Sequence, residues 1–419
     1  MLLHEAHGCP IVAVNIWYHV GSKNEIPGHT GFAHLFEHLM FEGSQHHDSG
    51  FFQPLQSAGA SLNGSTNADR TNYWEVVPAS ALELALWMES DRMGFLLPAL
   101  TEQKFTNQRD VVLNERRQNY ENRPYGLASM AMLATLFPTD HPYHWTTIGE
   151  IADLNRARVE EAHEFFRRYY HPANASIALA GDFESESTLE LVRSYFEGIA
   201  PGPAVAPVSR TVSLESDRRI VLEDRVELPR LYLGWLTPAM FADGDAELDL
   251  ATDLLAHGKT SRLYRRLVYK DRIATDVSAS QSSREMSSFV QMSATAAPGH
   301  TLTELHAAIT EEVAKLSDEG PTDIEIERGR VQAETQFVQR LQTVGGFGGK
   351  SDQLNAYNTY LGRPDYFADD LGRYSRVTHA SLQRTIKSFV CDAHYVMLSI
   401  VPRGRLDLAM ADSEAIAVS

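Results

Sequence analysis

The chain alternates short apolar runs that have strand character with longer amphipathic stretches that have helix character. Residues 11–20 (IVAVNIWYHV) are rich in β-branched and aromatic side chains and predict a strand, and a helical pattern follows over residues 30–41. The same criteria predict further strands at 62–67, 72–77 and 175–180, and helices at 80–95, 102–120, 158–170 and 186–196. The first half of the chain is therefore expected to fold as one domain of strands and helices.

The second half repeats this order of elements. Strands are predicted at 231–236, 274–281, 288–295 and 394–401, and a helix at 245–257 stands where residues 30–41 stood. A shared order at a period of about 200 residues predicts an α+β protein made of two homologous, duplicated domains, each a mostly antiparallel sheet packed with helices.

The two halves are separated by a stretch without periodicity. Residues 198–207 (GIAPGPAVAP) contain three prolines and two glycines, a composition typical of a linker. We therefore expect an N-terminal domain over residues 1–200, a linker over 201–215 and a C-terminal domain over 216–419.

Composition narrows the classes of partner and of metal site. The formal net charge of −18 argues against nucleic acid and anionic membranes as partners, and no apolar run is long enough to span a bilayer. The first residues lack the basic-then-apolar pattern of a leader, and the composition suits a soluble protein of the cytoplasm or the periplasm. The two cysteines, Cys9 and Cys391, exclude a cysteine-rich zinc site, so any metal would use histidine and carboxylate ligands.

One short segment carries metal chemistry. In HTGFAHLFEHLMFEGS (residues 29–44), His34 and His38 are four residues apart, so both imidazoles project from one face of a helix. Zinc suits two neutral imidazoles and a carboxylate, with a fourth position left for water. Glu37 lies beside this pair and is the candidate general base for peptide hydrolysis, in the inverted His-x-x-Glu-His order.

A third ligand must come from another helix. Glu115, in DVVLNERRQNY (residues 110–120), is the strongest candidate because the segment places an acid beside an apolar face. Periodicity alone does not reject three rivals, which are Glu89, Glu102 and Glu121.

Four motifs resemble the pitrilysin or M16 metallopeptidase family, in particular its short bacterial members related to mitochondrial processing peptidase. These motifs are GFAHLFEHLMFEGS, LNGSTNADRTNYWEVVP, RDVVLNERRQ and HPYHWTTIGEIADL, and the likeness extends over nearly the whole chain. The resemblance implies a zinc site completed by Glu115, some 75 residues past the second histidine in this family. It also implies a clam-shell of duplicated halves around a peptide chamber.

The resemblance assigns roles to further residues. It implies that Asn63, Gly64 and Ser65 form an edge strand on which peptide substrates add by backbone pairing. The alternative is a plain sheet edge in which Asn63 caps a turn. Many relatives carry a second glutamate seven residues before the third ligand, where this chain has Gln108. A seven-residue step returns to the same helix face, so Gln108 can hydrogen-bond behind the metal ligands without supplying charge.

One expected feature of the family is missing. Complete members carry an arginine and a tyrosine seven residues apart in the second half, and the matching positions here hold Val268 and Thr275. Arg266, Tyr269 and Arg272 are nearby at the wrong spacing. We therefore expect a zinc endopeptidase of unfolded peptides whose site is shared with a paralogous subunit, as a heterodimer rather than a homodimer. The alternative is a non-catalytic scaffold or interaction subunit.

Overall fold

The structure is a computed structural model that describes residues 1–417, and these form two compact units. The first unit comprises Met1–Glu115, Trp145–Val208 and Gln336–Ala368, and the second comprises Arg116–His144, Ser209–Thr335 and the chain from Asp369 onwards. Across the described part of the chain, no helix combines the length and the apolar character that a bilayer crossing requires.

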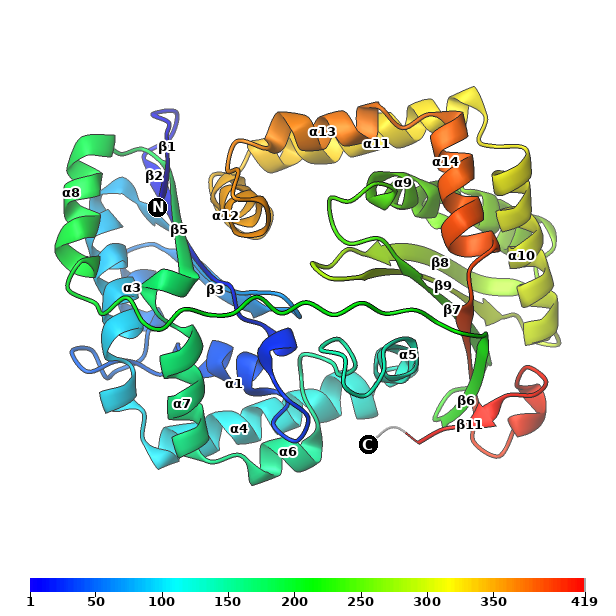
Figure 1. The fold of residues 1–419 in the computed structure, drawn as a ribbon, viewed down its shortest axis with the longest axis horizontal. Helices are drawn as coiled ribbons and strands as arrows, with labels where there is room; N and C mark the ends of the chain where they lie inside the picture. Colours follow the sequence, from blue (N-terminus) through cyan, green and yellow to red (C-terminus); the bar gives the residue numbers. More distant parts are fainter. Residues whose placement is uncertain (418–419) are drawn as a thin grey trace. The chain divides into compact units, whose positions relative to one another are not determined.

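The first unit is built on a five-stranded sheet in the order β1-β5-β2-β4-β3. Strands β1, β2, β3 and β5 are labelled in Figure 1. Only the β1–β5 pair is parallel; the other pairs are antiparallel. Its strands are β1 (Leu2–Glu5), β2 (Ile11–Tyr18), β3 (Ser61–Thr66), β4 (Thr71–Pro78) and β5 (Ala175–Gly181). Its helices are α1 (Phe32–Leu39), α2 (Phe52–Ser57), α3 (Leu82–Phe95), α4 (Glu102–Arg116), α6 (Ile151–Arg156), α7 (Val159–Tyr169), α8 (Ser185–Phe196) and α12 (Lys350–Leu361).

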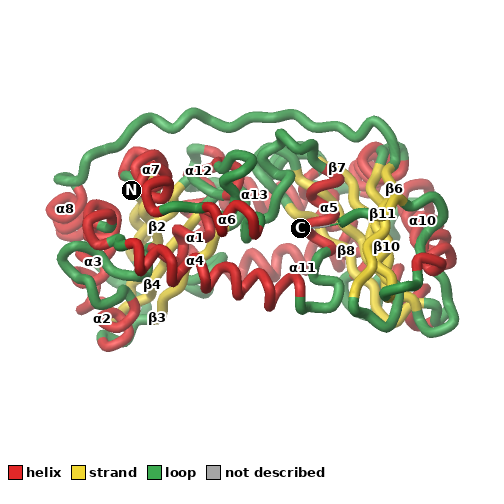
Figure 2. The backbone as a smooth tube through the Cα atoms, turned by 90° about the horizontal axis from the view of Figure 1, so that it is seen from below, coloured by secondary structure: helices red, strands yellow, loops and turns green. Residues whose placement is uncertain are grey.

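The second unit has a six-stranded sheet in the order β11-β6-β10-β7-β9-β8, beside which α10 lies (Figure 2). Its strands are β6 (Arg218–Asp224), β7 (Arg230–Thr237), β8 (Ala274–Ser282), β9 (Ser288–Ala296), β10 (Tyr395–Pro402) and β11 (Glu414–Ala415). Its helices are α5 (Ala128–Leu136), α9 (Asp245–Ala256), α10 (Leu302–Asp318), α13 (Phe367–Ser375) and α14 (His379–Ile386), and α11 (Asp323–Leu341) runs from the second unit into the first.

The two sheets repeat one topology, which confirms the predicted duplication and the α+β class. If β6 is matched to β1, β7 to β2, β8 to β3, β9 to β4 and β10 to β5, both orders become identical, and β11 is an addition at one edge. The parallel pair occupies the same place in both sheets. The segment between α8 and β6, residues 197–217, contains neither helix nor strand, and the predicted domain boundaries at 200 and 216 fall within it.

The compact units differ from contiguous halves of the sequence because two helices are exchanged. Helix α5, from the first half, packs on β7 and β10, whereas α12, from the second half, packs on β2 and β5. Asp352 of α12 fixes this packing in the first unit. Its buried carboxylate accepts hydrogen bonds from Trp17 Nε1 at 2.8 Å and from Asn72 Nδ2 at 3.2 Å.

Strand β2 shows how the first sheet is held between helices on both faces. Val12 and Val14 belong to the buried apolar cluster that includes Leu86 of α3, while the alternating position Trp17 contacts α12. Because both faces of β2 are covered, its sequence is a nearly continuous apolar run. The sheet thus forms a rigid platform, and α1 contacts it at β3 and β4.

Candidate metal centre

Helix α1 presents its polar residues on one face because its apolar residues are buried on the other. Phe36 is fully buried and packs against Phe165 and Tyr170, with ring centroids 5.7 and 5.2 Å away. Tyr73 of β4 donates a hydrogen bond to the Phe36 carbonyl at 3.3 Å. His34, Glu37 and His38 occupy the opposite face and border a cavity of about 480 Å³. The packing therefore fixes which way the histidines point.

The start of α1 is anchored by two buried carboxylates that the sequence analysis missed. Glu25 accepts hydrogen bonds from the backbone N–H groups of Gly31 and Ala33, at 3.0 and 2.8 Å. Asp153 accepts from the backbone N–H and the hydroxyl of Thr30, at 3.1 and 2.7 Å. Burial raises the pKa of Glu25 to about 8, although the two backbone donors partly offset this effect. The free N–H groups of a helix start invite such partners, but no spacing rule identifies them.

A close approach of two glycines completes this anchor. Gly31 has φ 91°, a left-handed conformation that favours glycine, and Gly149 has φ 77°. A Cβ atom on Gly149 would stand 2.4 Å from the Gly31 Cα atom, so this position has no room for a side chain. The helix that carries both histidines is therefore fixed in place before any metal binds.

Helix α4 brings Glu115 to the two histidines. The Glu115 Oε2 atom is 3.6 Å from Nε2 of His34 and 3.6 Å from Nε2 of His38. Among the described residues, these three form a group whose ligand atoms all lie within 4.8 Å of one another. None of the three rival glutamates belongs to it. Glu89 is fully buried against Arg92, Glu121 pairs with Arg116, and Glu102 begins α4 on the surface.

This donor set fits zinc in chemistry and in spacing. Tetrahedral zinc with ligands at about 2.0–2.2 Å separates its ligand atoms by roughly 3.3–3.6 Å, close to the distances from Glu115. Burial, followed by the neighbouring His38, lowers the pKa of His34 to about 3, so this imidazole is neutral, as a ligand must be. The His34 Nδ1 atom is buried without a hydrogen-bond partner in the described chain.

Glu37 lies beside the donor set with the properties of a general base. Burial raises the pKa of Glu37, and a hydrogen bond from Thr66 together with the charges of His38 and Arg70 partly offsets this effect. A raised pKa brings a carboxyl group closer to the range in which it accepts and returns protons near neutral pH.

The remaining predicted residues lie around the same cavity. Gln108 contacts His38 and Glu42, and Asn63 of β3 lines the cavity wall. Strand β3 is the edge of its sheet, so Asn63 is in a strand rather than at a turn, and its side chain accepts from the Gly64 N–H at 2.8 Å. The Ser65 carbonyl accepts a hydrogen bond from Arg70 at 2.8 Å, so this part of the edge already has a donor.

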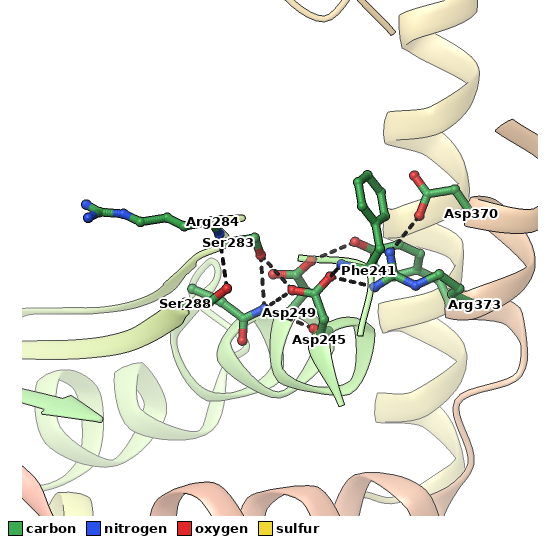
Figure 3. A network of polar contacts seen from close by, with 10 residues as sticks. Phe241, Asp245, Asp249, Ser283, Arg284, Ser288, Asp370 and Arg373 are labelled. Carbon is green, nitrogen blue, oxygen red and sulfur yellow. Dashed lines mark hydrogen bonds and ion pairs between the residues drawn. The ribbon is translucent and has the colours of Figure 1, made fainter. Parts of the chain in front are cut away.

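The corresponding helix of the second unit does not repeat the histidine pair. Gly244 precedes α9 with φ 95°, as Gly31 precedes α1 with φ 91°. When these two glycines are aligned, the positions of His34, Glu37 and His38 are occupied by Glu247, Leu250 and Ala251 respectively. A network of hydrogen bonds and ion pairs surrounds the start of α9 (Figure 3). Asp245 accepts from Arg373, Gln281 and Ser283, and Asp249 accepts from the Tyr374 hydroxyl at 2.6 Å. The second copy therefore retains the helix and lacks the site.

Two family models match this chain, one in each half. Residues 1–142 match the model described as insulinase (peptidase family M16), and residues 156–332 match the model described as peptidase M16 inactive domain. The chain belongs to the M16 peptidase family.

Relatives across the M16 family agree with this assignment. The chain is 29% identical over 361 residues to the zinc protease PqqE of Helicobacter pylori, which covers 85% of this chain and 81% of that protein. It is 22% identical over 406 residues to a probable mitochondrial-processing peptidase subunit beta of Arabidopsis thaliana, which covers 93% and 74%.

Solved structures show the same M16 fold. A protease from Helicobacter pylori superposes with a TM-score of 0.86 at 25% identity, covering 94% of this chain and 95% of that one. A protein from Pseudomonas fluorescens described as peptidase M16 inactive domain gives 0.84 at 17% identity, covering 96% and 95%. The latter likeness concerns the fold alone.

Proposed function

We propose that this chain is the zinc-binding subunit of an M16 endopeptidase that hydrolyses unfolded peptides. The observation that carries the proposal is the convergence of His34, His38 and Glu115 on one point, with Glu37 beside them at the wall of an open cavity. The names of the relatives support zinc as the metal. A scaffold would need none of these four side chains.

Each residue has a defined task in this proposal. Zinc held by His34, His38 and Glu115 would polarise a peptide carbonyl and lower the pKa of water. Glu37 takes a proton from a water molecule in the cavity on its carboxylate and then delivers it to the amine of the leaving peptide. Strand β3 offers its open edge at Asn63 and Gly64 to an extended substrate.

The proposal includes a second, paralogous subunit that supplies an arginine and a tyrosine. Arg266, the nearest arginine to the position of Val268, is already occupied. It forms ion pairs with Glu311 at 2.5 Å, Glu312 at 2.8 Å and Asp271 at 3.3 Å, and the Glu311 hydrogen bond leads the effects that raise its pKa. Tyr269, although 79% exposed, has the wrong spacing. Without a donor to the developing oxyanion, rates typically fall by about 10²–10³.

The test uses the full chain alone and after co-expression with a paralogue that carries the Arg/Tyr pair. Metal analysis should find one zinc per chain, and a quenched fluorescent peptide without structure should be cleaved only by the assembled pair. Full-rate cleavage by the isolated chain would refute the shared site. A chain that binds no zinc and gains no thermal stability from it would instead be a scaffold.

A further inference from the structure

The side-chain amide of Gln108 bridges a histidine of the candidate metal centre to a carboxylate. Gln108 Oε1 is 3.2 Å from Nδ1 of His38, and Gln108 Nε2 donates a hydrogen bond to Oε1 of Glu42. Glu42 follows the end of α1 by three residues, and Gln108 lies two turns before Glu115 on α4. All three side chains line the cavity of the metal centre.

The partners of this amide fix its direction. An ionised carboxylate only accepts hydrogen bonds, so the Gln108 NH₂ group must face Glu42. The amide oxygen therefore faces His38, and the His38 Nδ1 atom must carry the proton. This tautomer leaves the lone pair on Nε2, the atom that is 3.6 Å from Glu115 Oε2.

His34 provides the contrast within the same site. Its Nδ1 atom is buried without a hydrogen-bond partner among the described residues, so no hydrogen bond at Nδ1 selects the tautomer of that ring. Of the two histidines, only His38 therefore has a hydrogen-bond partner at Nδ1 that can fix its tautomer.

We propose that Glu42 is a positioning residue that acts on His38 through the Gln108 amide. Glu42 orients the amide, the amide holds the proton of His38 on Nδ1, and Nε2 stays available to the metal. The inference rests on the proposed zinc site and deepens it. This arrangement also gives the uncharged Gln108 a role. The carboxylate behind His38 belongs to Glu42, and the Gln108 amide links it to the histidine.

The first test compares three variants of the chain. Partners behind a metal-bound histidine are typically worth about 10–100-fold in metal affinity, so Glu42→Ala should weaken zinc binding by that factor. Glu42→Gln, which can still accept from Gln108 through its amide oxygen, should lose less. Glu102→Gln, an exposed acid at the start of α4, is the matched control and should bind zinc as the wild type does. Competition with a chromophoric chelator measures each dissociation constant.

A rescue variant separates this role from packing. In Glu42→Gln/Gln108→Glu, the carboxylate stands directly behind His38 and the amide at position 42 can donate to it, so zinc affinity should return toward the wild-type value. A second readout needs no metal. Ring ¹⁵N shifts of labelled histidine should show the Nδ1–H tautomer of His38 in the metal-free wild type and a mixture in Glu42→Ala.

The outcomes separate this inference from the proposed function. If Glu42→Ala binds zinc as tightly as the control, or if the double variant stays as weak as Glu42→Ala while the tautomer is unchanged, the inference is wrong and the zinc site stands. If the wild type binds no zinc, the proposed function is wrong, and the tautomer comparison in the metal-free protein still decides the role of Glu42.

Discussion

Two buried carboxyl groups in the first unit share a single cation, and this predicts an unusual pH dependence. Glu75 on β4 and Glu89 on α3 are both fully buried, and Arg92 donates to both oxygens of Glu89. The Arg92 guanidinium also lies 3.8 Å from the ring centroid of Phe51. No donor among the described residues reaches either oxygen of Glu75. Burial, and then the charge of Glu89, raises the pKa of Glu75 well above its usual range.

Glutamine substitutions at the two positions should therefore differ. Glu75→Gln mimics the protonated acid and should preserve the fold, whereas Glu89→Gln leaves a buried guanidinium unpaired, at a cost of about 3–5 kcal/mol. The pH dependence follows from linkage. The folded state keeps a proton on Glu75 that the unfolded chain loses above the ordinary glutamate pKa of 4.5. The contribution of Glu75 to the free energy of unfolding of the wild type is therefore fully present below that pH. It falls by about 1.4 kcal/mol per pH unit as the pH rises, until the pKa of Glu75 in the folded state is reached.

The stability of Glu75→Gln minus that of the wild type should accordingly rise with pH above 4.5, by at most about 1.4 kcal/mol per pH unit. Urea unfolding followed by tryptophan fluorescence measures this difference, because Trp17, Trp74, Trp87 and Trp145 lie in the first unit and only Trp235 lies in the second. The exposed Glu102→Gln should show no such slope. A difference that stays constant with pH, or a Glu75→Gln variant as unstable as Glu89→Gln, would refute a protonated Glu75.

Three further predictions concern the helix that carries the histidines. Glu37→Gln should retain zinc by metal analysis but lower peptide cleavage by the assembled pair by about 10²–10⁴, the typical contribution of a general base. Gly149→Ala should lower the melting temperature and the zinc affinity together, because the added methyl group meets Gly31 at 2.4 Å. Glu25→Gln replaces one acceptor with an NH₂ group that cannot pair with a backbone N–H of Gly31 or Ala33. Because burial raises the pKa of Glu25 to about 8, urea unfolding above that pH, where the wild-type carboxylate is ionised, should show a loss of about 1–3 kcal/mol. Unchanged zinc affinity in Gly149→Ala would contradict the role assigned to the glycine contact.

The fold could be predicted from sequence wherever the local pattern was sufficient. The β-branched and aromatic run of β2 and the repeated element order predicted four strands of each sheet, because strand patterns and their order survive duplication. Strands β1, β6 and β11 were not predicted. The exchange of α5 and α12 could not be predicted, since an apolar helix face does not specify which sheet it will cover. The predicted helix over 102–120 ends at Arg116, and residues Arg117–Glu121 continue as a π-helical turn, a change of hydrogen bonding that leaves no mark on hydrophobic periodicity.

The candidate site was predictable in part for similar reasons. His34 and His38 are four residues apart on one helix, so spacing alone places them together. Glu115 is distant in sequence, and only the family resemblance separated it from its rivals. Glu25, Asp153 and Glu42 act through hydrogen bonds between segments, and their geometry exists only in the folded chain.

Zinc binding by the purified chain and its Glu115→Gln variant tests whether His34, His38 and Glu115 hold one zinc ion. We expect one zinc per wild-type chain and no loss of zinc affinity in Glu102→Gln. In Glu115→Gln the loss should exceed the roughly 100-fold upper range for partners behind a ligand. A Glu115→Gln variant that binds zinc as tightly as the wild type, or a wild type that binds none, would contradict this expectation.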